Sequence, residues 1–173
     1  MKKILFLTSI ALLTACAMGG YANNPDEYIV AFKKGGNAFV DSLKKTDTAE
    51  IRRKRAVVAD DLAALASQCI NGKVVRSRLQ EGALSSRSDV LFKAAVEKTP
   101  AGRQVLSVKV RDLNNSVPGA PADGMYMLVA ELEEEAGSTD IAFYYAPGAP
   151  YQNIVDAVKV WGNNGSAKCP DLS

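Results

Sequence analysis

The sequence predicts an α+β fold: a helical N-terminal half, an antiparallel β-meander of about three to four strands, and a closing C-terminal helix. Three observations lead to this prediction. Apolar residues recur at helical spacing up to Cys69, and after residue 102 they alternate with polar residues as they do in strands. This segregation of helical and strand patterns favours α+β over an alternating α/β fold. Cys69 and Cys169 are two of three cysteines and can supply one disulfide bond.

The first predicted helix begins at Asn24-Pro25, because these residues suit the N-cap and the first helical position. Gly35-Gly36 interrupts it, and each glycine costs about 1 kcal/mol relative to alanine in a helix. The segment is therefore one interrupted helix or two short helices. Its apolar residues at roughly helical spacing are Ile29, Phe32, Phe39, Val40 and Leu43.

The second predicted helix runs from Asp47 to Cys69. Asp47 and Glu50 resemble a capping box, and Asn71-Gly72 supplies a stop signal. One narrow apolar stripe contains Ile51, Val58, Leu62, Leu65 and Cys69. A bridge from Cys69 would fasten the C-terminal tail across the last turn of this helix.

The next two segments are less regular. Lys73–Gln80 is compatible with the first strand of a sheet. Asp89–Lys98 has nearly continuous apolar residues and fits either a helix or a strand. We favour a helix there, because Ser86 or Ser88 can cap it.

Three strands and a helix are predicted in the remaining chain. Residues 103–113 alternate, and so do 124–135 and 139–147. A last helix begins at Pro150 and ends in the glycine-asparagine segment 162–165. The side chains predicted to point inward from the first two strands are Leu106, Val108, Val110, Tyr126, Leu128, Ala130 and Leu132.

The N-terminus has the pattern of a secretory signal. Lys2 and Lys3 precede an apolar stretch of about ten residues, Ile4–Leu13. A membrane-spanning helix needs about 20 apolar residues, so this stretch fits the hydrophobic region of a signal peptide instead.

The signal ends in Leu13-Thr14-Ala15-Cys16, which resembles the lipobox of bacterial lipoproteins. The resemblance covers residues 1–16 only. It implies removal of residues 1–15 and acylation of Cys16, with palmitate among the usual chains. Because Ala17 rather than aspartate follows, it also implies the outer membrane, on its periplasmic face. The alternative is an ordinary signal peptide followed by an incidental cysteine.

The domain organisation follows from this reading. Residues 16–24 form a lipidated tether, and residues 25–173 form a single periplasmic domain. Of 21 basic and 19 acidic residues, Lys2 and Lys3 leave with the signal, so the mature chain is balanced. This balance gives no indication of nucleic-acid binding, which depends on many phosphate contacts.

An even pair of cysteines in an oxidising compartment most simply means one disulfide, here Cys69–Cys169. Two free buried thiols are the alternative. The chain contains no histidine, which excludes a Ser-His-Asp triad, a Cys-His pair and imidazole ligands for zinc. We therefore expect no catalytic residues, no metal site and no cofactor. Ser42-Leu43-Lys44-Lys45 matches the S-x-x-K pattern, but its companion motifs are missing.

Two clusters are candidate contact sites. The basic run Arg52, Arg53, Lys54 and Arg55 would suit an anionic partner, such as lipid headgroups, lipopolysaccharide, cell-wall polymer or an acidic protein. The second candidate is an aromatic patch, because tyrosine anchors many interfaces. Its members are Tyr144, Tyr145 and Tyr151.

The function predicted from these features is a non-enzymatic outer-membrane lipoprotein. It would bind a periplasmic or outer-membrane protein, as an accessory or structural component of the cell envelope. The alternatives are a module that binds a glycan or lipid, and an inhibitor or immunity protein against a cell-wall hydrolase.

Overall fold

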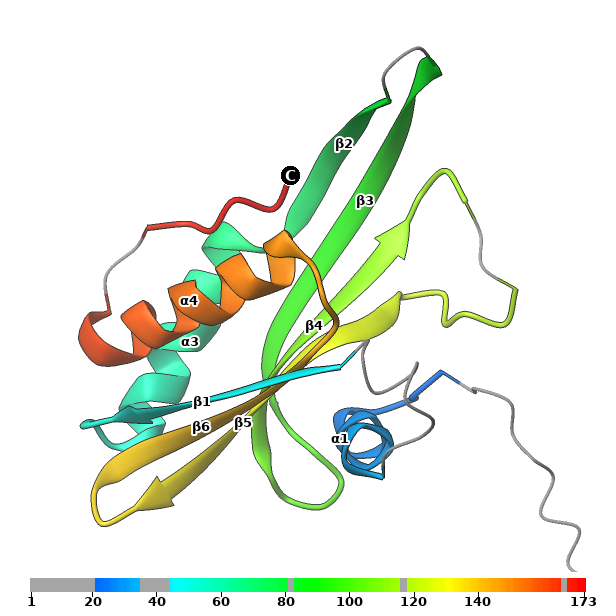
Figure 1. The fold of residues 1–173 in the computed structure, drawn as a ribbon. Coiled ribbons are helices and arrows are strands. Elements are labelled where there is room, and N and C mark those ends of the chain that lie inside the picture. The colour runs from blue at the N-terminus through cyan, green and yellow to red at the C-terminus, as the bar shows by residue number, and fades with distance from the viewer. Residues whose placement is uncertain (1–20, 35–43, 81–82, 116–117, 166–167) are drawn as a thin grey trace, which may run out of the picture.

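The protein is one six-stranded antiparallel sheet with helices on both faces (Figure 1). The computed structural model describes residues 21–34, 44–80, 83–115, 118–165 and 168–173. The elements in chain order are α1 (Pro25–Lys33), β1 (Lys45–Ile51), α3 (Arg55–Cys69), β2 (Gly72–Gln80), β3 (Ala83–Lys98), β4 (Gln104–Asp112), β5 (Met125–Glu135), β6 (Ser138–Tyr145) and α4 (Ala149–Asn164).

The strands lie in the order β1-β6-β5-β4-β3-β2, so two strands separated only by α3 form opposite edges. α3 contacts four strands as it crosses the sheet from β1 to β2. β3 pairs with β4 only from Val90 to Lys98, whereas its earlier residues pair with β2 alone. The β2–β3 ribbon consequently projects beyond the other strands (Figure 1).

The main core lies between the sheet and the pair α3 and α4. Alternate residues of β4, β5 and β6 point into it, as period-two side-chain geometry requires. Its fully buried members include Val58, Leu62, Phe92, Leu106, Val108, Leu128, Leu132, Ile141, Phe143, Ile154, Val158 and Trp161.

A second, smaller core lies between α1 and the opposite face of the sheet. It contains Ile29 of α1 with Val105, Tyr126 and Val129 of the sheet. A β-bulge brings Tyr126 to this face: Val108 pairs with Leu128, but the next residue, Lys109, pairs with Tyr126. The sequence-based expectation that Tyr126 points the same way as Leu128 is therefore wrong.

The predicted helical N-terminal half is wrong, because residues 45–51 form the edge strand β1. Asp47 caps no helix; its carboxylate accepts a 2.5 Å hydrogen bond from Lys159 of α4. The β-branched Thr46 and Thr48 suit a strand, and every residue of this segment lies opposite a residue of β6 in the antiparallel register. α3 begins at Arg55 instead, with no side-chain cap.

The predicted helix at residues 89–98 is also wrong, since these residues belong to β3. Val90 and Phe92 are buried against the helices, whereas Leu91 and Lys93 lie on the other face. The helix-facing residues are apolar, and on the other face Leu91 and Ala95 alternate with the exposed Lys93 and Glu97, which makes the apolar run look continuous. With β1 and β3 the sheet has six strands, not three or four.

The closing helix α4 and the disulfide bond are present. α4 ends before Gly165, whose φ of +63° is the left-handed conformation that glycine favours after a helix. Cys69, the last residue of α3, is bonded to Cys169. The indole Nε1 of Trp161 donates to the carbonyl of Lys168, so the tail is held to both helices.

Candidate binding surfaces

The predicted lipidation residue, Cys16, lies outside the described residues, which begin at Tyr21. Ala22 already packs against the small core under α1. The ring of Tyr21 lies beside Gly119 in the β4–β5 loop, 4.0 Å from the place of a Cβ on that glycine. The N-terminal approach to α1 is thus in contact with the folded domain from its first described residues.

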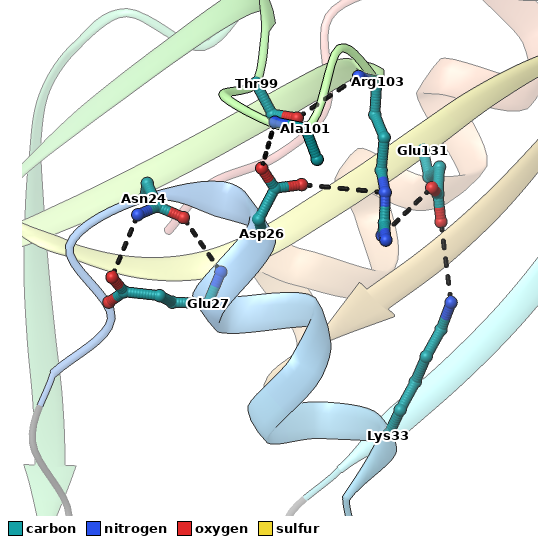
Figure 2. Close-up of polar contacts among 8 residues, drawn as sticks. All are labelled: Asn24, Asp26, Glu27, Lys33, Thr99, Ala101, Arg103 and Glu131. Carbon is teal, nitrogen blue, oxygen red and sulfur yellow. Dashed lines mark hydrogen bonds and ion pairs between the residues drawn. The ribbon is translucent and has the colours of Figure 1, made fainter.

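The start of α1 is fixed by local hydrogen bonds (Figure 2). The Asn24 side chain accepts from the backbone N–H of Glu27 at 2.9 Å and donates to its carboxylate at 3.0 Å. Hydrogen bonds from Asn23, first from its backbone, lower the pKa of Glu27. This reciprocal cap matches the predicted N-cap and sets the direction in which the chain enters the helix.

An ion network fastens α1 to the sheet (Figure 2). Arg103 lies 3.2 Å from the carboxylate of Glu131 and 3.7 Å from that of Asp26. Asp26 also accepts a hydrogen bond from the backbone N–H of Ala101 at 2.9 Å, and Lys33 reaches Glu131 at 3.7 Å. Both ends of α1 therefore have an ionic contact to the strands or to the β3–β4 turn.

Glu131 is the centre of this network. Its side chain is only 7% exposed, and a buried carboxylate is costly unless cations and hydrogen bonds compensate its lost hydration. Lys33 and Arg103 together supply this compensation. The position of α1 over β5 is accordingly determined by charge as well as by apolar contact.

Aromatic rings and lysines surround the same helix. Tyr28 packs 5.2 Å from Phe32 and 6.1 Å from Tyr126, and Phe32 packs 5.9 Å from Tyr144. Burial raises the pKa of Tyr28. The ammonium groups of Lys33, Lys44 and Lys109 lie 5.2, 5.7 and 4.6 Å from the centres of Tyr144, Phe32 and Tyr126. We call the surface formed by Tyr21–Asn24, α1 and the sheet side opposite α3 and α4 the tether face.

A groove of about 510 Å³ runs over β3 and β4 on the tether face. Lys93 and Lys109 stand directly opposite each other in the strand register, an arrangement that is unfavourable for like charges. Asp123 relieves it through a 2.5 Å ion pair with Lys109. The hydrogen bond from Lys109 lowers the pKa of Asp123. Ser107 lies farther along the groove.

An acidic hollow of about 300 Å³ lies at the other end of the tether face. Asp140 pairs with Glu50 on one side and Glu133 on the other, so three carboxylates form a row across β1, β6 and β5. Lys109 pairs near the start of β5, whereas Glu133 is near its end. The tether face therefore has Lys93 and Lys109 together with Glu97 and Asp123 at one end, and a row of three carboxylates at the other.

The basic run predicted as an anionic contact lies in the turn between β1 and α3. Arg53 is engaged internally: its guanidinium donates to Asp61 at 2.7 Å and to the carbonyl of Gly162 at 2.9 Å. Arg52 and Lys54 are exposed, and Arg55 is half-buried. The structure thus places one member of the run in the junction between α3 and α4 and leaves two fully at the surface.

The residues of the predicted aromatic patch lie on different faces of the sheet. Tyr144 is half-buried beside Phe32 on the tether face. Tyr145 and Tyr151 are only 4% and 6% exposed, because they belong to the core under the helices. The structure does not bring these three tyrosines together.

Sequence reasoning missed the group around Glu131. Only the alternate residues from Tyr126 to Leu132 of this strand were predicted to point inward, so the burial of Val129 and Glu131 was not predicted. Yet residues 125–132 carry apolar side chains on both faces, and that is the pattern of a strand covered on both sides. Val129 is fully buried and Glu131 is 5% exposed.

Two further observations concern the described part of the chain. No helix there is long and apolar enough to cross a bilayer. Among the same residues, no group of three or more His, Cys, Asp or Glu side chains is arranged to hold a metal ion.

Comparisons with known proteins place the chain in no family. No family model matches the sequence, and no curated protein is significantly similar to it. Among solved structures, the crystal structure of Ara h 8.0201 aligns with a TM-score of 0.33 and 11% sequence identity. The alignment covers 69% of this chain and 96% of that chain. A similarity at this level carries no conclusion about fold or function.

Proposed function

We propose that the protein is a lipid-anchored component of the bacterial cell envelope, held at the periplasmic face of the outer membrane through Cys16. It acts by binding another envelope protein and performs no catalysis of its own. The anchor rests on the signal and lipobox pattern of residues 1–16. The binding role is supported by one structural observation: side chains fill the space between the sheet and helices α3 and α4.

Because side chains fill that space, a partner has to be recognised by the outer surface of the domain. On the side of α3 and α4, Val57 is 45% exposed and Val160 is 47% exposed. The exposed cations Arg52 and Lys54 precede Val57 by a few residues. Apolar contact flanked by positive charge suits an acidic protein surface, since complementary charge guides association and fixes its register.

Site-specific photo-cross-linking tests the partner. A cross-linking amino acid at Val57 should join the protein to one envelope protein in intact cells. The same substitution at Val30 of α1, which is 56% exposed, is the control on the other side of the sheet. Changing Arg52 and Lys54 to Glu should abolish the Val57 product. Adducts only with abundant porins would contradict the proposal.

A separate experiment tests the anchor. Mass spectrometry of the mature N-terminal peptide should find acyl chains on Cys16, and the full-length Cys16→Ser variant should leave the membrane fraction. A bare Cys16 in membrane-extracted wild-type protein would refute anchoring, whatever the cross-linking gives.

The groove over β3 and β4 favours a second candidate function, binding of a polar ligand such as a glycan. Its volume falls within the range of ligand sites, and ammonium, carboxylate and hydroxyl groups line it. Titration calorimetry with soluble peptidoglycan fragments should then show binding. Ala95→Arg, which puts a bulky side chain in the groove at an exposed position, should remove the binding.

A further inference from the structure

The connection between the acylated cysteine and the folded domain is short. Ala22, which packs against the core under α1, follows Cys16 by six residues. An extended chain covers at most about 3.3–3.6 Å per residue, so these residues span no more than about 20 Å. With Cys16 at the lipid surface, the point where the chain joins the tether face lies within about 20 Å of the bilayer.

The exposed side of α1 has the chemistry of a membrane-surface helix. Its inner side chains pack on the sheet, whereas Val30 is 56% exposed and Lys34 is exposed beside the half-exposed side chain of Lys33. Apolar side chains next to lysines are the composition that binds the boundary between headgroups and acyl chains.

The sheet adds charge to the same side. Lys93 and Arg111 are exposed on β3 and β4. The two carboxylates that line the groove beside Lys93 are already engaged: Asp123 by Lys109, and Glu97 by the hydroxyl of Ser107. The row of three carboxylates in the acidic hollow lies at the other end of the sheet.

We propose that the tether face is a lipid-contact surface that lies against anionic phospholipid headgroups. This inference rests on the proposed acylation of Cys16. The groove-bearing end of the face, where Lys93 and Arg111 are exposed, lies closest to the lipid, and the acidic hollow tilts away from it. Helices α3 and α4 consequently point into the periplasm, where Val57 and the exposed basic residues beside it are free to meet a partner.

A pair of matched labels tests the orientation. Val30→Cys and Val160→Cys each replace an exposed valine, the first on α1 and the second on α4. Because Cys69 and Cys169 are bonded to each other, the introduced cysteine is the site that a maleimide dye modifies. The lipidated protein is reconstituted in vesicles of phosphatidylethanolamine and phosphatidylglycerol that contain a lipid with a quencher on its headgroup.

The expected result is severalfold stronger quenching of the dye at position 30 than at position 160. Equal quenching, or stronger quenching at position 160, overturns the orientation. Mass spectrometry of the Cys16 peptide from the same sample separates the two proposals. With acylated Cys16, a reversed pattern refutes only the orientation; with a bare Cys16, the anchor fails and the orientation fails with it.

Charge variants test the role of anionic lipid. Lys34→Glu with Lys93→Glu should reduce the quenching difference, and so should vesicles of phosphatidylcholine alone. The matched control, Lys54→Glu with Lys168→Glu, makes the same change in net charge at exposed residues on the helix side and should leave the difference intact. An identical effect of both double variants would show that only total charge matters and would overturn the proposed surface.

Discussion

Single ion pairs connect elements that are distant in sequence, and the pair between Asp47 and Lys159 is an example. It joins the edge strand β1 to α4, and the Lys159 ammonium also lies 5.8 Å from the centre of the Phe143 ring. Both charged side chains are about one-third exposed, so solvent screens the pair. Pairs of this kind contribute about 0.2–1 kcal/mol to stability.

The pH dependence of that pair is the first prediction. The hydrogen bond from Lys159 is the main cause of the lowered pKa of Asp47 in the folded protein. The stabilisation is therefore present above the unfolded-state pKa of about 3.9 and is lost as the pH falls through the lower folded-state pKa. Asp47→Asn should cost up to about 1 kcal/mol at pH 7.

Urea unfolding at pH 7 and at pH 2 measures this effect. The difference between wild type and Asp47→Asn should shrink toward zero at the acidic end. A difference of constant size at pH 7 and pH 2 would mean that lost packing, rather than lost charge, explains the variant.

Gly124 supports a close approach between the β4–β5 loop and β4. Its φ is +107°, and a Cβ there would lie 2.9 Å from the carbonyl oxygen of Val110. Gly124→Ala should therefore destabilise the fold by about 1–3 kcal/mol. Gly72→Ala is the matched control, because nothing lies within 4 Å of its added Cβ. Thermal unfolding should separate the two variants; similar melting temperatures would contradict the argument.

At the scale of elements, the docking of α1 depends on compensation of Glu131. Arg103→Gln leaves this buried carboxylate with the more distant Lys33 and should cost about 1–3 kcal/mol. The loss should appear locally as faster hydrogen exchange of the α1 amides, with α3 unchanged. Lys98→Gln, at an exposed position near the same turn, should have little effect. Unchanged exchange in α1 would show that apolar contacts alone hold the helix.

Local patterns predicted some elements well. The strands β4 and β6 and the final helix have strong alternation or helical spacing, and Leu106 and Val108 point to the core as expected. β1 was missed because Asp47 and Glu50 imitate a helix start. Only β6, distant in sequence, makes that segment a strand, and no local pattern contains this information.

The candidate surfaces were harder to predict for the same reason. The tyrosines at 144, 145 and 151 are close in sequence, but strand alternation separates the first two, and α4 buries the third in the core. Arg53 looked like a free cation in the sequence, but Asp61 of α3 and the carbonyl of Gly162 in α4 accept its hydrogen bonds. The cysteine pair was predictable because a covalent bond between two available thiols has few alternatives.

For the whole molecule, the disulfide bond is the largest single constraint that the sequence predicts. It closes a loop with a sequence separation of 100 residues, for which the entropy lost by the unfolded chain corresponds to about 4–5 kcal/mol. Changing both cysteines to serine should lower the free energy of unfolding by about this amount. Wild type in reductant should match the double variant in guanidinium titrations, and insensitivity of wild type to reductant would contradict the bond.

The pairing of β1 with β6 sets the order in which the fold can be completed. Lys45 lies opposite Tyr145, so this edge of the sheet stays unpaired until most of the polypeptide has emerged from the ribosome. Pairing between such distant segments is intrinsically slow. A chain secreted as we propose has to be threaded through the translocation channel before it folds. Because β1 pairs only with the distant β6, the sheet cannot be completed until nearly the whole chain has passed through the channel.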